Sequence, residues 1–129
     1  MSITRESFAL TRSTAWAKTV WVSPDPDVYP REPGLTEISA QVFMTSLTGT
    51  SPIVRVALQG TNKPAATDAD YIELHHVDFT TDGNDWLGQG AHKTIEIKDY
   101  SYLRIRATTS SGTVVTGTIT VYLQGDRVI

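Results

Sequence analysis

The chain contains no cysteine, so neither a disulfide nor a thiolate metal site can form. It carries 11 Lys and Arg against 14 Asp and Glu, and this acidic balance argues against direct nucleic-acid binding. No apolar run approaches the roughly 18 residues that a membrane-spanning helix needs, so no membrane partner is expected. The acidic Glu6 stands where a signal peptide would begin its apolar core. The absence of cysteine favours synthesis in a reducing cytoplasm, or a protein that relies on packing and assembly for stability.

Catalytic patterns are also missing. No Gly-x-Ser-x-Gly elbow occurs, and His75 and His76 are adjacent in a predicted strand, where neighbouring side chains point to opposite faces. A zinc site needs at least three protein ligands, and only one of these histidines can join Glu73. We therefore predict no enzyme activity, no cofactor and no metal. Whether the turn from Asp82 to Asp85 binds calcium stays open, because it has carboxylates but lacks the spaced ligands of a calcium loop.

Alternation of apolar and polar residues dominates the sequence and predicts strands rather than helices. Hydrophobic content of 40% and charged content of 19% fit one folded domain over residues 1–129. We expect about eight strands, at residues 2–10, 17–23, 36–46, 53–60, 71–75, 93–98, 102–108 and 117–125. Strands with one polar face bury the other face by stacking two sheets. The prediction is an all-β antiparallel sandwich, most simply a jelly roll.

The segment 51–60 is the clearest of these strands. Val54, Val56 and Leu58 are expected to point inward, with Arg55 and Gln59 outward. The preceding segment 36–46 places four apolar residues on one face: Ile38, Ala40, Val42 and Met44. Because only a short turn separates the two segments, we predict that they pair as an antiparallel hairpin.

The segment 23–34 holds four of the chain's six prolines. Proline at this density excludes a helix or a central strand and favours a stiff, extended path. The segment is either a rigid connection between strands or an arm that lies on a neighbouring subunit. The N-terminal segment 1–15 is the other part that neighbours could hold.

Aromatic side chains suggest two kinds of surface, because flat rings stack on sugars and also fill protein interfaces. Trp21 and Phe43 fall on strand faces opposite the apolar stripes, which favours an interface between proteins. Together with the proline-rich segment they give the predicted interface residues: Trp21, Pro24, Pro26, Tyr29, Pro30 and Phe43.

Three short stretches carry a resemblance to a known group of proteins. They are Leu-Gln-Gly-Thr-Asn at 58–62, Tyr-Leu-Arg-Ile-Arg at 102–106 and Thr-Val-Tyr-Leu-Gln-Gly at 120–125. Over roughly residues 50–125 the chain resembles small jelly-roll virion proteins of tailed bacteriophages. The pattern is also similar to discoidin-like and carbohydrate-binding jelly rolls, in which an Asp-Gly turn usually follows the asparagine. Here Lys63 and Pro64 follow it, which weakens the transfer of a ligand-binding loop.

The phage resemblance implies a capsid decoration, or cement, protein. Such proteins assemble as oligomers, often trimers, and bind the major capsid protein on the surface of the virion. The expected partners are therefore the major capsid protein and copies of this chain, after synthesis in the host cytoplasm. The alternative is a carbohydrate-binding module or a tail or baseplate accessory protein. A carbohydrate-binding module should present a cluster of exposed rings, whereas a cement protein should bury its rings between subunits.

Overall fold

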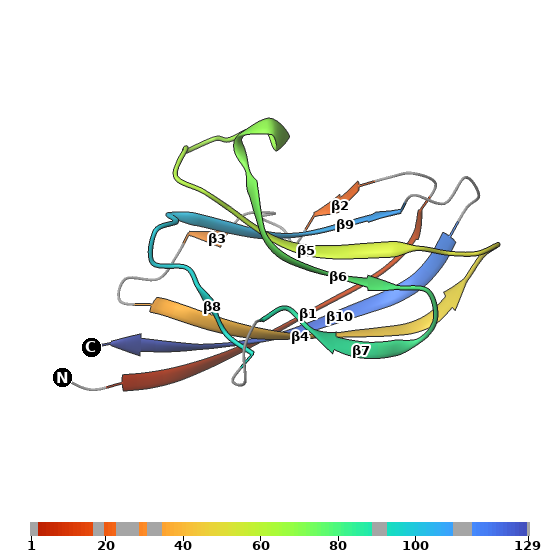
Figure 1. Ribbon diagram of the computed structural model, residues 1–129, viewed down its shortest axis with the longest axis horizontal. Helices are drawn as coiled ribbons and strands as arrows, with labels where there is room; N and C mark the ends of the chain where they lie inside the picture. Colours follow the sequence, from red (N-terminus) through yellow and green to blue (C-terminus); the bar gives the residue numbers. More distant parts are fainter. Residues whose placement is uncertain are drawn as a thin grey trace.

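The structure is a computed structural model, and it describes the backbone of residues 3–16, 20–22, 29–30, 35–88, 93–109 and 115–128. Side chains are described within 37–88, 93–109 and 116–122. The described chain forms two layers of antiparallel strands that face each other (Figure 1).

Sheet A, the lower layer in Figure 1, has the strand order β1-β10-β4-β7, with β8 also paired to β4. Its strands are β1 (Ile3–Trp16), β4 (Leu35–Thr48), β7 (Gly83–Trp86), β8 (Ile95–Glu96) and β10 (Val115–Val128). The first and last strands pair along their full lengths, with Ile3 opposite Val128 and Trp16 opposite Val115. The start of β1 and the end of β10 therefore lie side by side.

Sheet B, the upper layer, has the order β2-β9-β5-β6, with β3 also paired to β9. Its strands are β2 (Val20–Val22), β3 (Tyr29–Pro30), β5 (Val54–Thr61), β6 (Ile72–Phe79) and β9 (Tyr102–Thr109). Between β5 and β6 the chain rises over the outer surface of this sheet and forms the short 3₁₀ helix η1 (Asp68–Asp70) (Figure 1).

The pairing of the strands is nested. Without the two-residue strands β3 and β8, the remaining strands pair first with last (β1–β10), second with seventh (β2–β9), third with sixth (β4–β7) and fourth with fifth (β5–β6). This is the connectivity of a jelly roll, a long antiparallel ribbon wound into two facing sheets. The predicted all-β jelly-roll sandwich is confirmed.

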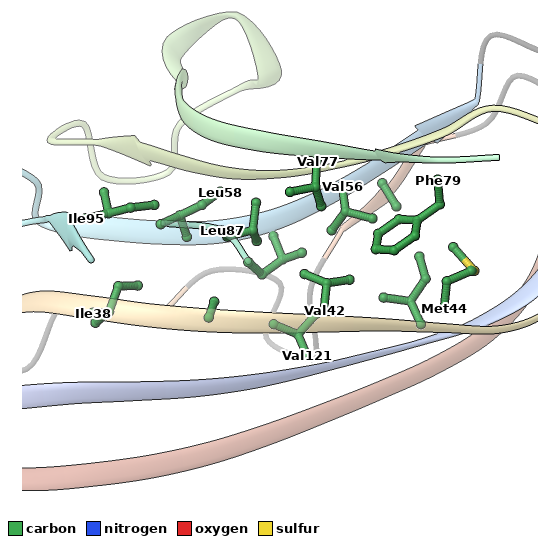
Figure 2. Close-up of a cluster of buried hydrophobic side chains, with 14 of the residues drawn as sticks. Ile38, Val42, Met44, Val56, Leu58, Val77, Phe79, Leu87, Ile95 and Val121 are labelled. Atoms are coloured by element: carbon green, nitrogen blue, oxygen red, sulfur yellow. The ribbon is translucent and has the colours of Figure 1, made fainter. Parts of the chain in front are cut away.

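Apolar side chains from both sheets fill the space between the layers (Figure 2). On β4 alternate residues from Ile38 to Met44 are buried, and the inward-facing apolar residues of β5, β9 and β10 belong to the same core. The predicted inward residues Val54, Val56 and Leu58 are buried, and so is the predicted apolar face of 36–46. The other predicted strands that the structure describes add further buried apolar residues: Ile95, Ile97, Leu103, Ile105, Ala107, Ile119 and Val121. Burial of this contiguous set is the main force that holds the two sheets together.

The predicted hairpin between 36–46 and 53–60 is wrong. β4 lies in sheet A and β5 lies in sheet B, so the two strands face each other across the core. The connection bends sharply, with Ser46 and Ser51 at φ values of 56° and 47°. An apolar stripe looks the same in sequence whether two strands share a sheet or pack face to face, so alternation alone could not separate these arrangements.

Two further segments contain short strands that alternation did not mark. The predicted turn from Asp82 to Asp85 overlaps β7, whose residues Gly83 to Trp86 pair with Met44 to Gln41 of β4. Within the proline-rich segment, Tyr29 and Pro30 form β3 and pair with Leu103 and Tyr102 at the edge of sheet B. An edge position suits proline, which has no N–H to donate to a ladder.

Candidate functional site

The outer face of sheet A carries a cluster of aromatic side chains, the aromatic patch, formed by Phe43, Trp86 and Tyr122. The rings of Phe43 and Tyr122 meet edge to face, with centroids 5.6 Å apart and an interplanar angle of 84°. Tyr122 is 51% exposed and Trp86 is 37% exposed. Because both pair with Gln41 from opposite sides, their backbones stand two strand spacings apart, roughly 9.5 Å.

Uncharged polar side chains surround the aromatic patch. Gln41 lies between Tyr122 and Trp86 in the cross-strand row, and its Nε2 donates a hydrogen bond to Asn84 Oδ1 at 3.2 Å. The neighbouring rows hold Thr45, Thr118 and Thr120. Gln41, Phe43 and Thr45 of β4 share the outer face with their ladder partners in β7 and β10. Among the described side chains of these three rows, none is charged.

The structure places the predicted interface residues on two different surfaces. Phe43 lies in the aromatic patch on sheet A. Trp21 lies in β2, opposite Ala107, while Tyr29 and Pro30 form β3, so these three belong to the edge of sheet B. Pro24 and Pro26 lie outside the described residues.

Sequence reasoning missed two members of the patch. Tyr122 alternates with the core residue Val121 in a predicted strand, so its outward direction could have been inferred from the pattern. Trp86 follows Gly83 and Asn84, which are typical turn residues, and no alternation marks that segment as a strand.

The outer face of sheet B is polar and centres on the arginine cluster, which consists of Arg104, Arg106 and Asp68. Arg104 Nη1 lies 2.9 Å from Asp68 Oδ1, and Arg106 Nη2 lies 3.9 Å from Asp68 Oδ2. The Arg104 side chain is only 5% exposed, whereas that of Asp68 is 64% exposed. Hydrogen bonding to the Arg104 guanidinium holds the pKa of Asp68 below its usual range.

Arg104 is enclosed by its other neighbours. Its Nε donates to Gln59 Oε1 at 2.7 Å, and its guanidinium lies 3.8 Å from the centre of the Tyr71 ring. The loop between β5 and β6 is thus fixed to the sheet at Asp68 and Tyr71. Within that loop Asp70 accepts a hydrogen bond from the Thr67 backbone N–H at 2.7 Å, which lowers the pKa of Asp70.

Two of the stretches that carry the phage resemblance contact each other here. Gln59 pairs with Arg104 in the ladder between β5 and β9, and Gly60 pairs with Leu103. The ring of Tyr100 lies over Gly60, where a Cβ would come within 2.8 Å of it. Asn62 Oδ1 accepts a hydrogen bond from the backbone N–H of Ser101 at 2.8 Å. The Leu-Gln-Gly-Thr-Asn and Tyr-Leu-Arg-Ile-Arg stretches therefore form one structural unit.

The acidic and histidine-rich residues between 68 and 85 are spread over separate contacts. His76 Nδ1 lies 2.8 Å from Glu73 Oε2, and Arg55 Nε lies 3.0 Å from Asp78 Oδ1. Asp82, predicted to lie in a turn, accepts hydrogen bonds from the backbone N–H groups of Ser46 and Leu47. In the described part of the chain, no group of three or more His, Asp or Glu side chains is arranged to hold a metal ion.

Two open depressions are present at the margins of sheet B. One, of about 520 Å³, lies between β6 and β8 and is lined mainly by apolar residues and by the acidic Glu73, Glu96 and Asp99. The other, of about 270 Å³, lies beside the Arg55–Asp78 ion pair. Neither gathers the convergent donors of a catalytic site. Among the described residues, no helix has the length and apolar character needed to cross a bilayer.

Comparison with known proteins gives similarity of fold without similarity of sequence. No family model matches the chain, and no curated protein matches it by sequence. A solved structure of Bacillus endospore appendages, described as disulfide-linked pili, is 10% identical with a TM-score of 0.49 over 96% of this chain and 88% of that one. The capsid protein VP2 of infectious bursal disease virus, as a subviral particle, is 8% identical with a TM-score of 0.45 over 95% of this chain.

A structure of the Gx strain of the same virus is 7% identical, with a TM-score of 0.43 over 96% of this chain. The chain spans 37% and 38% of the length of the two viral chains. At these identities and TM-scores the likenesses carry no statement about what this chain does, and its all-β sandwich architecture follows from its own strand pairing.

Proposed function

We propose that this chain is a structural protein of a bacteriophage virion that decorates the assembled capsid and acts by docking rather than by catalysis. The aromatic patch on sheet A is the observation that carries the proposal. Phe43, Trp86 and Tyr122 stand exposed or half-exposed on a face without charged residues in its central rows. Protein interfaces are enriched in Tyr, Trp and Phe and depleted of charge at their centres.

The proposed partners are the major capsid protein and further copies of this chain, in a trimer on the capsid surface. The proline-rich segment, with Pro24 and Pro26, would extend the contact beyond the sheet, at the entropic cost of ordering an arm. A protein that binds the assembled shell but not its free subunits stabilises the shell by mass action. With no cysteine in the chain, this cohesion depends on non-covalent burial.

Co-sedimentation with assembled, undecorated shells of the phage that encodes the chain tests the proposal. The wild-type protein is expected to pellet with shells and to stay in solution with free capsid subunits. The double variant Phe43→Ser, Tyr122→Ser should lose at least tenfold in shell binding, because it removes the interlocked rings. Ile72→Ser is the matched control, since Ile72 is 53% exposed but lies on sheet B. Failure of the wild type to bind shells, or equal loss in both variants, would contradict the proposal.

A second candidate function is binding of a neutral glycan at the same patch. The amides of Gln41 and Asn84 beside the rings favour it, because stacked rings and amide hydrogen bonds match a polyhydroxyl chain. An exposed ring cluster is also what we expected of a carbohydrate-binding module. Calorimetric titration with neutral oligosaccharides decides between the two: saturable binding that Trp86→Ala abolishes, with no shell binding, would favour the glycan.

A further inference from the structure

The arginine cluster on sheet B has more buried donors than acceptors. Arg104 Nη2 and Arg106 Nε are buried and have no hydrogen-bond partner. Asp68 is the only carboxylate that the two guanidinium groups contact among the described residues, so two positive charges face one negative charge. A buried guanidinium group normally has its N–H groups paired, because a charged donor that loses water must regain a partner.

Asp68 satisfies this pair of arginines incompletely. One of its oxygens lies at hydrogen-bond distance from Arg104, but the other lies 3.9 Å from Arg106, which is beyond a hydrogen bond. The carboxylate is held at this position by its attachment to η1. An oxyanion that is free of the chain has no such restriction and can offer two oxygens to the planar fork of a guanidinium group.

We propose that the arginine cluster is an oxyanion-binding site, which Asp68 occupies as an internal ligand and which a carboxylate or phosphate group can take over. Asp68 is accessible from solvent, being 64% exposed, and Arg106 is 24% exposed, so an incoming anion reaches both without crossing the core. Gln59 and Tyr71 hold the guanidinium of Arg104 in place during the exchange.

The loop can release Asp68 without losing its other contacts. Asp70 keeps its hydrogen bonds from Thr67 and its ion pair with Lys63 at 3.3 Å, and neither depends on Asp68. The exchange therefore exposes the two arginines while η1 remains folded. The site lies on the opposite layer from the aromatic patch, so it is independent of the proposed capsid-binding face.

Titration with inorganic phosphate in Tris-chloride buffer at constant ionic strength, followed by amide chemical shifts, tests the proposal. The wild-type protein is expected to bind phosphate weakly, with shifts confined to residues near 59, 68–71 and 104–106. Asp68→Asn should bind at least tenfold more tightly, because it removes the competing carboxylate while keeping a side chain of the same size. A parallel titration with acetate distinguishes carboxylate from phosphate as the preferred oxyanion.

Arg106→Gln should abolish the tighter binding when combined with Asp68→Asn. Asp78→Asn is the matched control, because Asp78 pairs with Arg55 on the same sheet, and the Arg55 side chain is 48% exposed and needs no buried partner. Equal phosphate affinity in the wild type and Asp68→Asn would overturn the proposal. So would a shift pattern that Arg106→Gln leaves unchanged, or tighter binding by Asp78→Asn to the same extent.

Discussion

The ring of Tyr100 covers Gly60, and a Cβ built on residue 60 would lie 2.8 Å from Cγ of that ring. Real Cβ atoms do not approach other atoms so closely, so Gly60→Ala must displace Tyr100 or bend β5. We expect a loss of about 1–3 kcal/mol in the free energy of unfolding, as for other overpacked sites. Urea denaturation at 25 °C measures it.

Gly83→Ala provides the comparison, since nothing lies within 4 Å of the Cβ that it would add. We expect a change of less than about 0.5 kcal/mol for this variant, which is typical of an unconstrained surface site. Equal effects of the two substitutions would show that the Tyr100 contact is not what requires glycine at position 60.

Two isoleucines separate core burial from surface exposure. Ile97 is 0% exposed and Ile53 is 43% exposed. Ile97→Ala should cost about 2–5 kcal/mol, because it removes buried methyl groups and leaves a cavity. Ile53→Ala should cost less than about 1 kcal/mol, because substitutions at exposed sites change few packing contacts. If thermal and urea unfolding gave similar losses for both, the interior between the sheets would not be packed as described.

The carboxylate of Asp82 connects the β6–β7 turn to the end of β4. It accepts hydrogen bonds from the backbone N–H of Leu47 at 2.8 Å and of Ser46 at 3.1 Å. Asp82→Ala should lower the free energy of unfolding by about 1–2 kcal/mol, the range for charge-assisted bonds near the surface. Asp82→Asn, which keeps one oxygen, should lose about half as much. Hydrogen exchange at residues 46 and 47 should accelerate in both variants.

The Asp68–Arg104 pair makes stability depend on pH in a defined direction. Arg104 lowers the pKa of Asp68 in the folded protein. As the solution is acidified, the unfolded chain therefore binds more protons than the folded protein does. The contribution of the pair is complete above the unfolded pKa, near 4, and disappears as the pH falls through the lower folded value. The free-energy difference between wild type and Asp68→Asn should therefore shrink from pH 7 to pH 2.

The free energy of unfolding of wild type and of Asp68→Asn can be measured by urea denaturation at each pH. A difference between them that stays constant from pH 7 to pH 2 would contradict this account of the Asp68–Arg104 pair. Asp78, whose pKa is also lowered by a hydrogen bond from an arginine, gives the reference for an exposed ion pair. Because the Arg55 side chain is 48% exposed, Asp78→Asn should have the smaller effect at neutral pH.

Alternation was sufficient to predict the fold class and most of the core, because burial on one face leaves a period of two in any strand. Val54, Val56 and Leu58 were predicted inward and are buried. The same signal could not show which strands share a sheet, and so β4 and β5 were wrongly predicted as a hairpin. Pairing depends on how the chain turns at Ser46 and Ser51, where non-glycine residues adopt positive φ.

The candidate site was predicted only in part, for a related reason. Phe43 stands out in sequence as an aromatic residue on a polar strand face. Its neighbours Tyr122 and Trp86 come from strands far away in sequence, and only the jelly-roll connectivity places all three on one face. Gln59 was predicted to point outward, and it lies on the outer face, but the loop above it and Arg104 leave it only 8% exposed.

The pairing of β1 with β10 constrains the order in which the protein can fold. Ile3 has Val128 as its ladder partner, so the edge of sheet A closes only after nearly the whole sequence has been synthesised. Until then β1 and β4 lack their common neighbour β10, and ribosome-bound chains should be sensitive to proteases along β1. Such long-range closure is slow, on the order of milliseconds to seconds for sandwiches of this kind.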